Sequence, residues 1–204
     1  VLSCDKAESP VYIPEQTVTM SYSISLDDMT KASEKTPVNY IWCGAYKVVD
    51  GVISDLPSSQ SLTEFNGGSV VCSVDMVKDQ SYKVVFIAQY YTETATELLP
   101  VYAFSANRAT VSFPSEDITN SDKFDLFSYV DSVTDFRPGT SKNITLTRKV
   151  AQINFVTTDE DRAAAEADGV KPTKFEVTLN NVYTSMSMLD SAPTSCANVC
   201  STTS

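Results

Sequence analysis

The sequence feature that most constrains the fold is a strict two-residue alternation near the N-terminus. Over residues 17–26, apolar side chains occupy every second position, and Ser or Thr occupies the positions between them. This pattern predicts a β-strand with one buried face and one face toward solvent. Such a strand requires further strands to cover its apolar face. The apolar positions are Val18, Met20, Tyr22, Ile24 and Leu26.

Several later segments also carry strand patterns. Residues 69–77 alternate, whereas residues 81–91 are apolar in both phases, which indicates a central strand covered on both sides. Residues 174–189 alternate again. Over residues 142–156 the alternation of apolar residues changes phase near Arg148, and we interpret the change as a β-bulge. We expect Arg148 to be a structural cation that pairs with a carboxylate there, rather than a functional one.

One helix is predicted near residues 158–168. Thr157 and Glu160 have the spacing of a capping box, and Gly169 follows the last helical residue. With about eight strands and one helix, the chain is expected to be mainly β, a two-sheet antiparallel β-sandwich with one short helix. The predicted core consists of Val18, Met20, Tyr22, Ile24, Tyr82, Val84, Phe86, Ile153, Phe155, Phe175, Val177 and Leu179.

The chain divides into three parts. Residues 1–16 include two prolines and no periodicity, so they are interpreted as a tether. Residues 17–190 form the predicted sandwich domain. Residues 191–204 are rich in Ser, Thr, Ala, Asn and Cys with little to bury, and are predicted to be a flexible tail or the start of a second domain.

Charge excludes several classes of function. The chain carries 15 Lys and Arg against 26 Asp and Glu, a formal charge of −11, and it contains no His. Nucleic-acid binding is not expected, because phosphate contacts need clustered Lys and Arg. The absence of His excludes Ser-His-Asp and Cys-His catalysis and the usual histidine zinc sites. We expect no enzyme activity, no cofactor and no metal.

Cys4 is the candidate lipidation site. It follows Val1-Leu2-Ser3, a short stretch that resembles the lipobox of bacterial lipoproteins, in which the signal peptide is cut before the cysteine and the sulfur is acylated. Acyl chains hold a protein at a bilayer by burying methylene groups. The alternative interpretation of Cys4 is an ordinary cysteine in a frayed terminus.

The other four cysteines allow two pairings. Cys43 and Cys72 lie in separate predicted strands, where they either bridge the strands or serve as small buried apolar residues, and we favour the second interpretation. Cys196 and Cys200 lie in the polar tail and are a candidate disulfide closing a small loop. A Cys₄ zinc site is not expected, because only the tail contains two closely spaced cysteines.

Three stretches together resemble a known family. They are YKVVFIAQ at residues 82–89, ITLTRKVAQINFVT at 144–157 and VTLNNVYTSMSMLDS at 177–191. In this order and spacing they resemble the N-terminal domain of the fimbrillin-like (Mfa-like) lipoproteins of the Bacteroidales. The resemblance covers about residues 17–191.

This resemblance implies a transthyretin-like sandwich and a surface-exposed protein of the outer membrane, held by a lipid anchor. It implies the role of a fimbrial subunit or a fimbria-associated adhesin component. The implied partners are other fimbrial subunits, or host or bacterial surface ligands. Two features depart from the family. The chain stops after one domain and a tail, and the loop after the first strand contains no Arg, only Lys31 and Lys35.

In the family, a protease cuts an early loop and the first strand is replaced by a strand from another subunit. The residues to which this applies are the candidate exchangeable strand, Val18 to Leu26, and the candidate protease-sensitive loop at Lys31 and Lys35. Loss of the strand would expose an apolar groove and an unpaired edge. The alternative is a permanent N-terminal strand, which the missing Arg favours.

A glycan-binding surface lipoprotein is the alternative function. It requires Trp42, Tyr90, Tyr91 or Tyr102 to lie exposed as a platform for stacking on sugars, whereas such residues more often fill a core. Two Asp-Ser-apolar tripeptides resemble O-glycosylation acceptors of this bacterial group, which makes Ser132 and Ser191 candidate sites in polar connections.

Acidic groups are weaker candidates for chemistry. Residues 159–161 contain three acids that could chelate Ca²⁺, but acids are also favoured at a helix N-terminus. Asp27, Asp28 and Asp117 have no partner identifiable from the sequence, so a catalytic carboxylate pair is not expected.

Overall fold

The order of elements follows the predicted β-rich pattern. The computed structural model describes residues 15–27, 38–113, 122–150, 159–169 and 175–203. It contains β1 (Thr17–Leu26), β2 (Tyr40–Val49), β3 (Val52–Ile53), β4 (Ser59–Glu64), β5 (Ser69–Val77), β6 (Ser81–Gln89), β7 (Tyr91–Glu93), β8 (Leu98–Pro100), β9 (Ala103–Phe104), β10 (Thr110–Ser112), a 3₁₀ turn (Asp122–Phe124), β11 (Leu126–Val133), β12 (Ser141–Arg148), α1 (Asp159–Ala167), β13 (Phe175–Ser187) and β14 (Pro193–Thr203).

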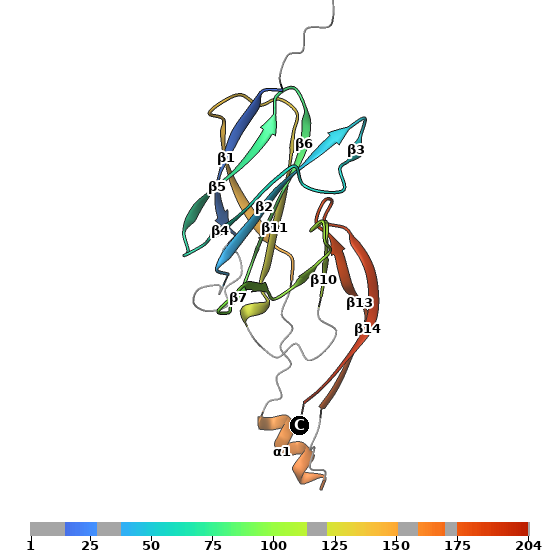
Figure 1. The fold of residues 1–204 in the computed structure, drawn as a ribbon. Helices are drawn as coiled ribbons and strands as arrows, with labels where there is room; N and C mark the ends of the chain where they lie inside the picture. The colour runs from blue at the N-terminus through green and yellow to red at the C-terminus, as the bar shows by residue number, and fades with distance from the viewer. Residues whose placement is uncertain (1–14, 28–37, 114–121, 151–158, 170–174, 204) are drawn as a thin grey trace, which may run out of the picture.

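Two layers of strands form the sandwich (Figure 1). The strands are hydrogen-bonded in the order β3-β2-β6-β11-β12-β1-β5, with β4 also paired to β2. β12 connects the layers, because it pairs with β1 along residues 141–146 and with β11 at Thr147 and Arg148. As a result, β5, β1 and β12 face β2, β6 and β11 across one apolar core. The predicted mainly β sandwich is confirmed.

β1 confirms the predicted N-terminal strand and adds an unexpected pairing. It is antiparallel to β5 from Thr17 to Ser25, but it is parallel to β12 from Ser21 to Leu26. Its even-numbered residues from Val18 to Ile24 are buried, and Leu26 is half-buried. The sandwich is therefore not wholly antiparallel, because β1 and β12 run in the same direction.

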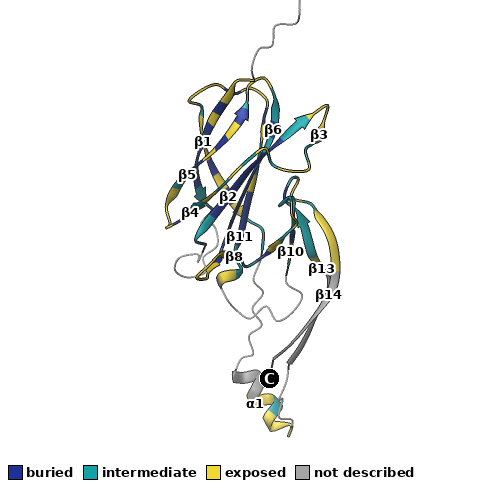
Figure 2. Cartoon of the chain, viewed as in Figure 1, coloured by how far each residue is buried: buried dark blue, intermediate teal, exposed yellow. Residues whose placement is uncertain are grey.

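β6 is buried along most of its length (Figure 2) and has a core on each side, as its apolar pattern predicts. Tyr82, Val84 and Phe86 face the core between the two layers. Val85 and Ile87 face a second core. A second, four-stranded sheet in the order β14-β13-β10-β9 contributes to this core through β9, β10 and the end of β13, which pack on the outer face of β2, β6 and β11. The fold therefore has a third layer that the two-sheet prediction did not include.

The predicted tail is wrong for residues 193–203, which form β14. This strand pairs with β13 from Phe175↔Thr203 to Met186↔Pro193, with three register shifts. An edge strand can form through backbone hydrogen bonds to its neighbour without a period of apolar side chains. Five predicted core residues are not placed: the side chains of Phe175, Val177 and Leu179 on β13 are not described, and Ile153 and Phe155 lie outside the described residues.

The predicted helix is confirmed as α1, whose last turn is followed by Gly169 at φ 73°. Glycine tolerates this left-handed backbone conformation without strain, which explains the stop. The predicted bulge near Arg148 falls at the end of β12, and residues 151–156 lie outside the described residues. Within the described part of the chain, no helix is long and apolar enough to span a membrane.

Candidate functional site

β1, the candidate exchangeable strand, is bound to both layers through Tyr22. The Tyr22 hydroxyl donates a hydrogen bond to Asp131 Oδ2 on β11 at 3.0 Å, and Lys142 Nζ on β12 lies 2.7 Å from the same oxygen. The Tyr22 ring meets Phe86 edge-on, with centroids 4.7 Å apart. Burial, and then the charge of Asp131, raise the pKa of Tyr22, so its hydroxyl remains a donor.

The opposite face of β1 is polar and exposed. Thr19 Oγ1 donates to Asp75 Oδ1 at 2.6 Å, and the hydroxyls of Ser21 and Ser73 are 3.2 Å apart. Hydroxyl pairs of this kind contribute little on a solvated surface compared with the buried face. The hold on β1 therefore comes mainly from its four buried side chains and from hydrogen bonds along both strand edges.

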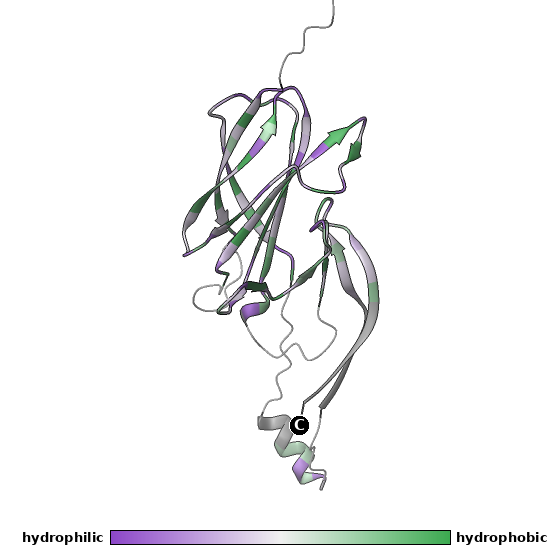
Figure 3. Cartoon of the chain, in the orientation of Figure 1, coloured by the Kyte–Doolittle hydropathy of each residue, from purple (hydrophilic) through white to green (hydrophobic). Residues whose placement is uncertain are grey.

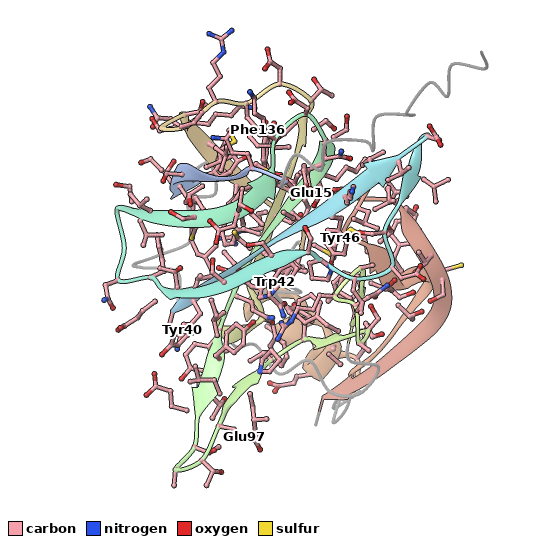
Figure 4. All side chains as sticks on the ribbon, turned by 45° about the horizontal axis from the view of Figure 1, so that its top comes forward. Glu15, Tyr40, Trp42, Tyr46, Glu97 and Phe136 are labelled. Carbon is pink, nitrogen blue, oxygen red and sulfur yellow. The ribbon has the colours of Figure 1, made fainter. Side chains whose placement is uncertain are left out.

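The aromatic residues proposed for sugar stacking are mostly buried. Trp42, Tyr91 and Tyr102 are 3%, 1% and 3% exposed, and Tyr90 is partly buried with Lys123 Nζ 5.0 Å from its ring centroid. Trp42 and Tyr46 of β2, both labelled in Figure 4, belong to the second core. A buried ring offers no face to a sugar, so this platform does not exist.

Arg148 is the structural cation that the sequence predicts. Its Nη2 lies 3.1 Å from Asp125 Oδ2, and its guanidinium is 5.1 Å from the centroid of the Phe127 ring. A cation over an aromatic face with a carboxylate partner is a stable arrangement at the end of a strand. Arg148 therefore fixes the start of β11 against the end of β12.

The preferred interpretation of Cys43 and Cys72 is confirmed, since both are buried free thiols. Burial raises the pKa of Cys43 to about 12 and also raises the pKa of Cys72, so neither is a reactive thiolate. The candidate disulfide between Cys196 and Cys200 is wrong for this structure. Cys196 is a free, exposed cysteine, and four residues along β14 span about 13 Å, beyond the reach of a disulfide.

Ser132 and Ser191 are both exposed, but only one is in a connection. Ser191 lies between β13 and β14 at φ 57°, next to Asp190, whose Oδ1 accepts from the Ala192 N–H at 3.1 Å. Ser132 instead lies within β11, opposite Lys83 of β6. Its predicted position in a loop is wrong, because the polar stretch continues the strand pairing to Val133.

Several predicted residues lie outside the described part of the chain. These are Cys4, the loop residues Lys31 and Lys35, and Asp28 and Asp117. Asp27 follows β1, where its N–H donates to Leu146 O at 2.9 Å. The side chains of residues 159–161, the candidate Ca²⁺ ligands, are not described either.

The sequence interpretation missed an exposed apolar hairpin formed by β2 and β3. Its turn is Asp50-Gly51, both at positive φ, and it places Val49 and Val52 on the surface. Asp-Gly between two apolar residues is a strong signal for a two-residue hairpin turn, so the hairpin was readable. The exposure of the hairpin could not be predicted, because β-branched residues in a strand usually indicate burial.

These features define a β-rich protein with a buried, doubly paired N-terminal strand. Residues 13–203 match the model of DUF6562, a family of unknown function, and the chain belongs to this family. No curated protein matches the sequence. A solved structure to which the chain is similar is a fimbrial assembly protein from Parabacteroides distasonis, with 13% identity, a TM-score of 0.36, and coverage of 85% of this chain and 67% of that chain.

Proposed function

We propose that this chain is a lipid-anchored structural protein of the cell surface, a fimbrial subunit or a fimbria-associated adhesin component without catalytic turnover. The observation that carries the proposal is the placement of the two ends (Figure 1). The chain enters the sandwich at Gln16, whose carbonyl accepts from Lys78 N–H at 2.8 Å, and the β13–β14 ribbon extends beyond the opposite end. Such a subunit presents its far end outward.

The N-terminal segment has a suitable length for an anchor. Cys4 precedes Gln16 by 12 positions. A segment of that length can reach at most about 40 Å when fully extended, enough to place the sandwich clear of lipid headgroups. The resemblance of three strand motifs to fimbrillin-like lipoproteins supports the same role, with other fimbrial subunits or surface ligands as partners and the outer membrane as the location.

Acylation of Cys4 is the first test. We expect an alkyne fatty acid, supplied to cells that express the full precursor, to label the protein. The Cys4→Ala variant should not be labelled. The matched control is Cys196→Ala, which removes an exposed cysteine elsewhere and should retain full labelling. Equal labelling of Cys4→Ala and the parent would contradict the anchor.

We further propose that β1 is exchangeable for a strand donated by another subunit. Departure of β1 would leave β5 and β12 each with an unpaired edge and would open the core that Met20, Tyr22 and Ile24 fill. An added strand with the same alternation restores both hydrogen-bond ladders and the apolar contacts. The alternative is that β1 is a permanent strand of the sandwich.

Limited proteolysis tests the exchange. We expect cleavage at Lys31 or Lys35 to release residues 17–26 slowly, and the nicked protein to capture a labelled peptide of that sequence. A peptide of the same composition without the alternation should not bind, because its apolar residues face both sides. A Lys31→Gln/Lys35→Gln variant is the control for cleavage. If nicked protein retains its strand and captures no peptide, β1 is permanent.

A further inference from the structure

The hairpin of β2 and β3 carries an apolar surface patch. Val49, Val52 and Leu56 are 52%, 71% and 62% exposed, although they lie within eight consecutive residues. We call these three residues the hairpin patch. Exposed aliphatic side chains are common singly, but here Val49 and Val52 pair across the hairpin, and Leu56 follows in the connection to β4. A group of this kind on a projecting element marks an interaction site. Figure 3 shows this hairpin as a green, hydrophobic projection beside the sandwich.

The two faces of the hairpin differ. Val48 pairs with Ile53, and Ile53 packs against the second core. Val49 pairs with Val52, and because successive residues of a strand point to opposite faces, this pair faces away from that core. The patch is therefore not an incompletely covered part of the protein interior. It is the outer face of an element whose inner face is already packed.

The patch lies at the end of the sandwich where the chain enters. Val48 at the end of β2 pairs with Ser81 at the start of β6. The turn before Ser81 includes Lys78, which is hydrogen-bonded to Gln16, the residue that precedes β1. The hairpin and the N-terminal segment thus leave the same end, as Figure 1 shows. Any anchor at Cys4 would hold this end, and not the β13–β14 end, toward the membrane.

The charges around the patch indicate which kind of lipid contact it suits. Lys47, Asp50 and Asp55 flank it, which gives one positive and two negative groups. A basic cluster, which would bind anionic lipid headgroups, is not present on the hairpin. Aliphatic side chains instead gain free energy by leaving water for the boundary between headgroups and acyl chains.

We propose that the hairpin patch is a membrane-contact surface that lies on an uncharged lipid interface and fixes the orientation of the anchored sandwich. This inference rests on the lipid anchor of the proposed function, since three aliphatic side chains alone bind a bilayer weakly. With the anchor and the patch at the same end, the protein has a two-point attachment. The β13–β14 ribbon is then held outward.

The test uses a chemical anchor, so that it does not depend on natural acylation. The full chain, with Cys196→Ser and Cys200→Ser, is coupled through the Cys4 thiol to a maleimide lipid in phosphatidylcholine vesicles, with or without brominated acyl chains. Leu56→Trp reports on the patch, because bromine quenches only tryptophan that reaches the acyl region. Val71→Trp is the matched control, since Val71 is 60% exposed on β5, away from the entry end.

Both variants keep the buried Trp42, whose emission is the common baseline. We expect brominated lipid to reduce the tryptophan emission of Leu56→Trp about twofold and to leave that of Val71→Trp unchanged. Adding Val49→Ser and Val52→Ser to Leu56→Trp should abolish the quenching while circular dichroism remains unchanged. Equal quenching in Leu56→Trp and Val71→Trp would overturn the proposal and leave the anchor proposal intact.

A second measurement separates lipid from a second copy of the chain as the occupant. Sedimentation of the unanchored protein should show a monomer, with or without Val52→Ser. A dimer that Val52→Ser dissociates would overturn the membrane contact and assign the patch to an interface between copies. Labelling of Cys4 by fatty acid, described above, tests the anchor itself, so failure of one proposal is distinguishable from failure of the other.

Discussion

Tyr22→Ala is expected to lower the free energy of unfolding by about 3–5 kcal/mol, the cost of removing a large aromatic side chain from a packed core. Tyr22 is fully buried in the middle of β1, in contact with Phe86. The variant also removes the hydroxyl that bonds to Asp131, which retains Lys142 as a partner. Urea denaturation followed by circular dichroism measures the change.

Tyr22→Phe separates the two contributions. It keeps the ring and removes only the hydrogen bond to Asp131, so we expect a loss of about 1 kcal/mol. If Tyr22→Phe were as destabilising as Tyr22→Ala, the bond to Asp131 rather than ring packing would hold β1. A loss below about 1 kcal/mol for Tyr22→Ala would show that the core closes around the missing ring.

Gly44→Ala is expected to destabilise the protein by about 1–3 kcal/mol through overpacking. Gly44 is buried on β2, and an added Cβ would lie 2.4 Å from Cη2 of the Trp42 indole and 2.6 Å from Cζ2. The indole has little freedom to move. Its Nε1 donates to Gln60 Oε1 at 3.2 Å, and the Arg108 guanidinium lies 5.3 Å from its centroid.

A double-mutant cycle identifies the cause of this loss. Phenylalanine lacks the distal ring that crowds Gly44, so in a Trp42→Phe background Gly44→Ala should cost less than about 0.5 kcal/mol. The coupling energy between the two sites, obtained from urea denaturation of all four proteins, should then exceed about 0.5 kcal/mol. Additive losses would mean that the strain arises from the backbone of β2 instead.

The sequence predicted the strands whose side chains obey one clear rule. Alternation placed β1 and its buried face correctly, and apolar residues in both phases correctly indicated that β6 has a core on each side. β14 was not predictable in this way, because its polar residues are held by backbone bonds to β13. Hydrophobic periodicity reports side-chain burial, and an edge strand can form without it.

The candidate site was predicted less completely. Arg148 was interpreted correctly because a lone cation in an apolar strand needs a carboxylate, and Asp125 supplies it. The burial of Trp42 and Tyr102 was undecided because it depends on the third layer, whose strands β9 and β10 are only two and three residues long. Such short strands carry too few positions for a period to be recognised.

The parallel pairing of β1 with β12 has a consequence for how the protein folds. Ser21 pairs with Ser141, so the first strand must wait for a partner that is 120 positions later in the chain. Contacts of this separation incur a large loop-closure entropy before they form, and they slow folding. At about 5–20 residues per second, synthesis takes several seconds to reach β12. During that interval β1 can pair with β5 alone, so one edge of this N-terminal strand waits unpaired until β12 has been made.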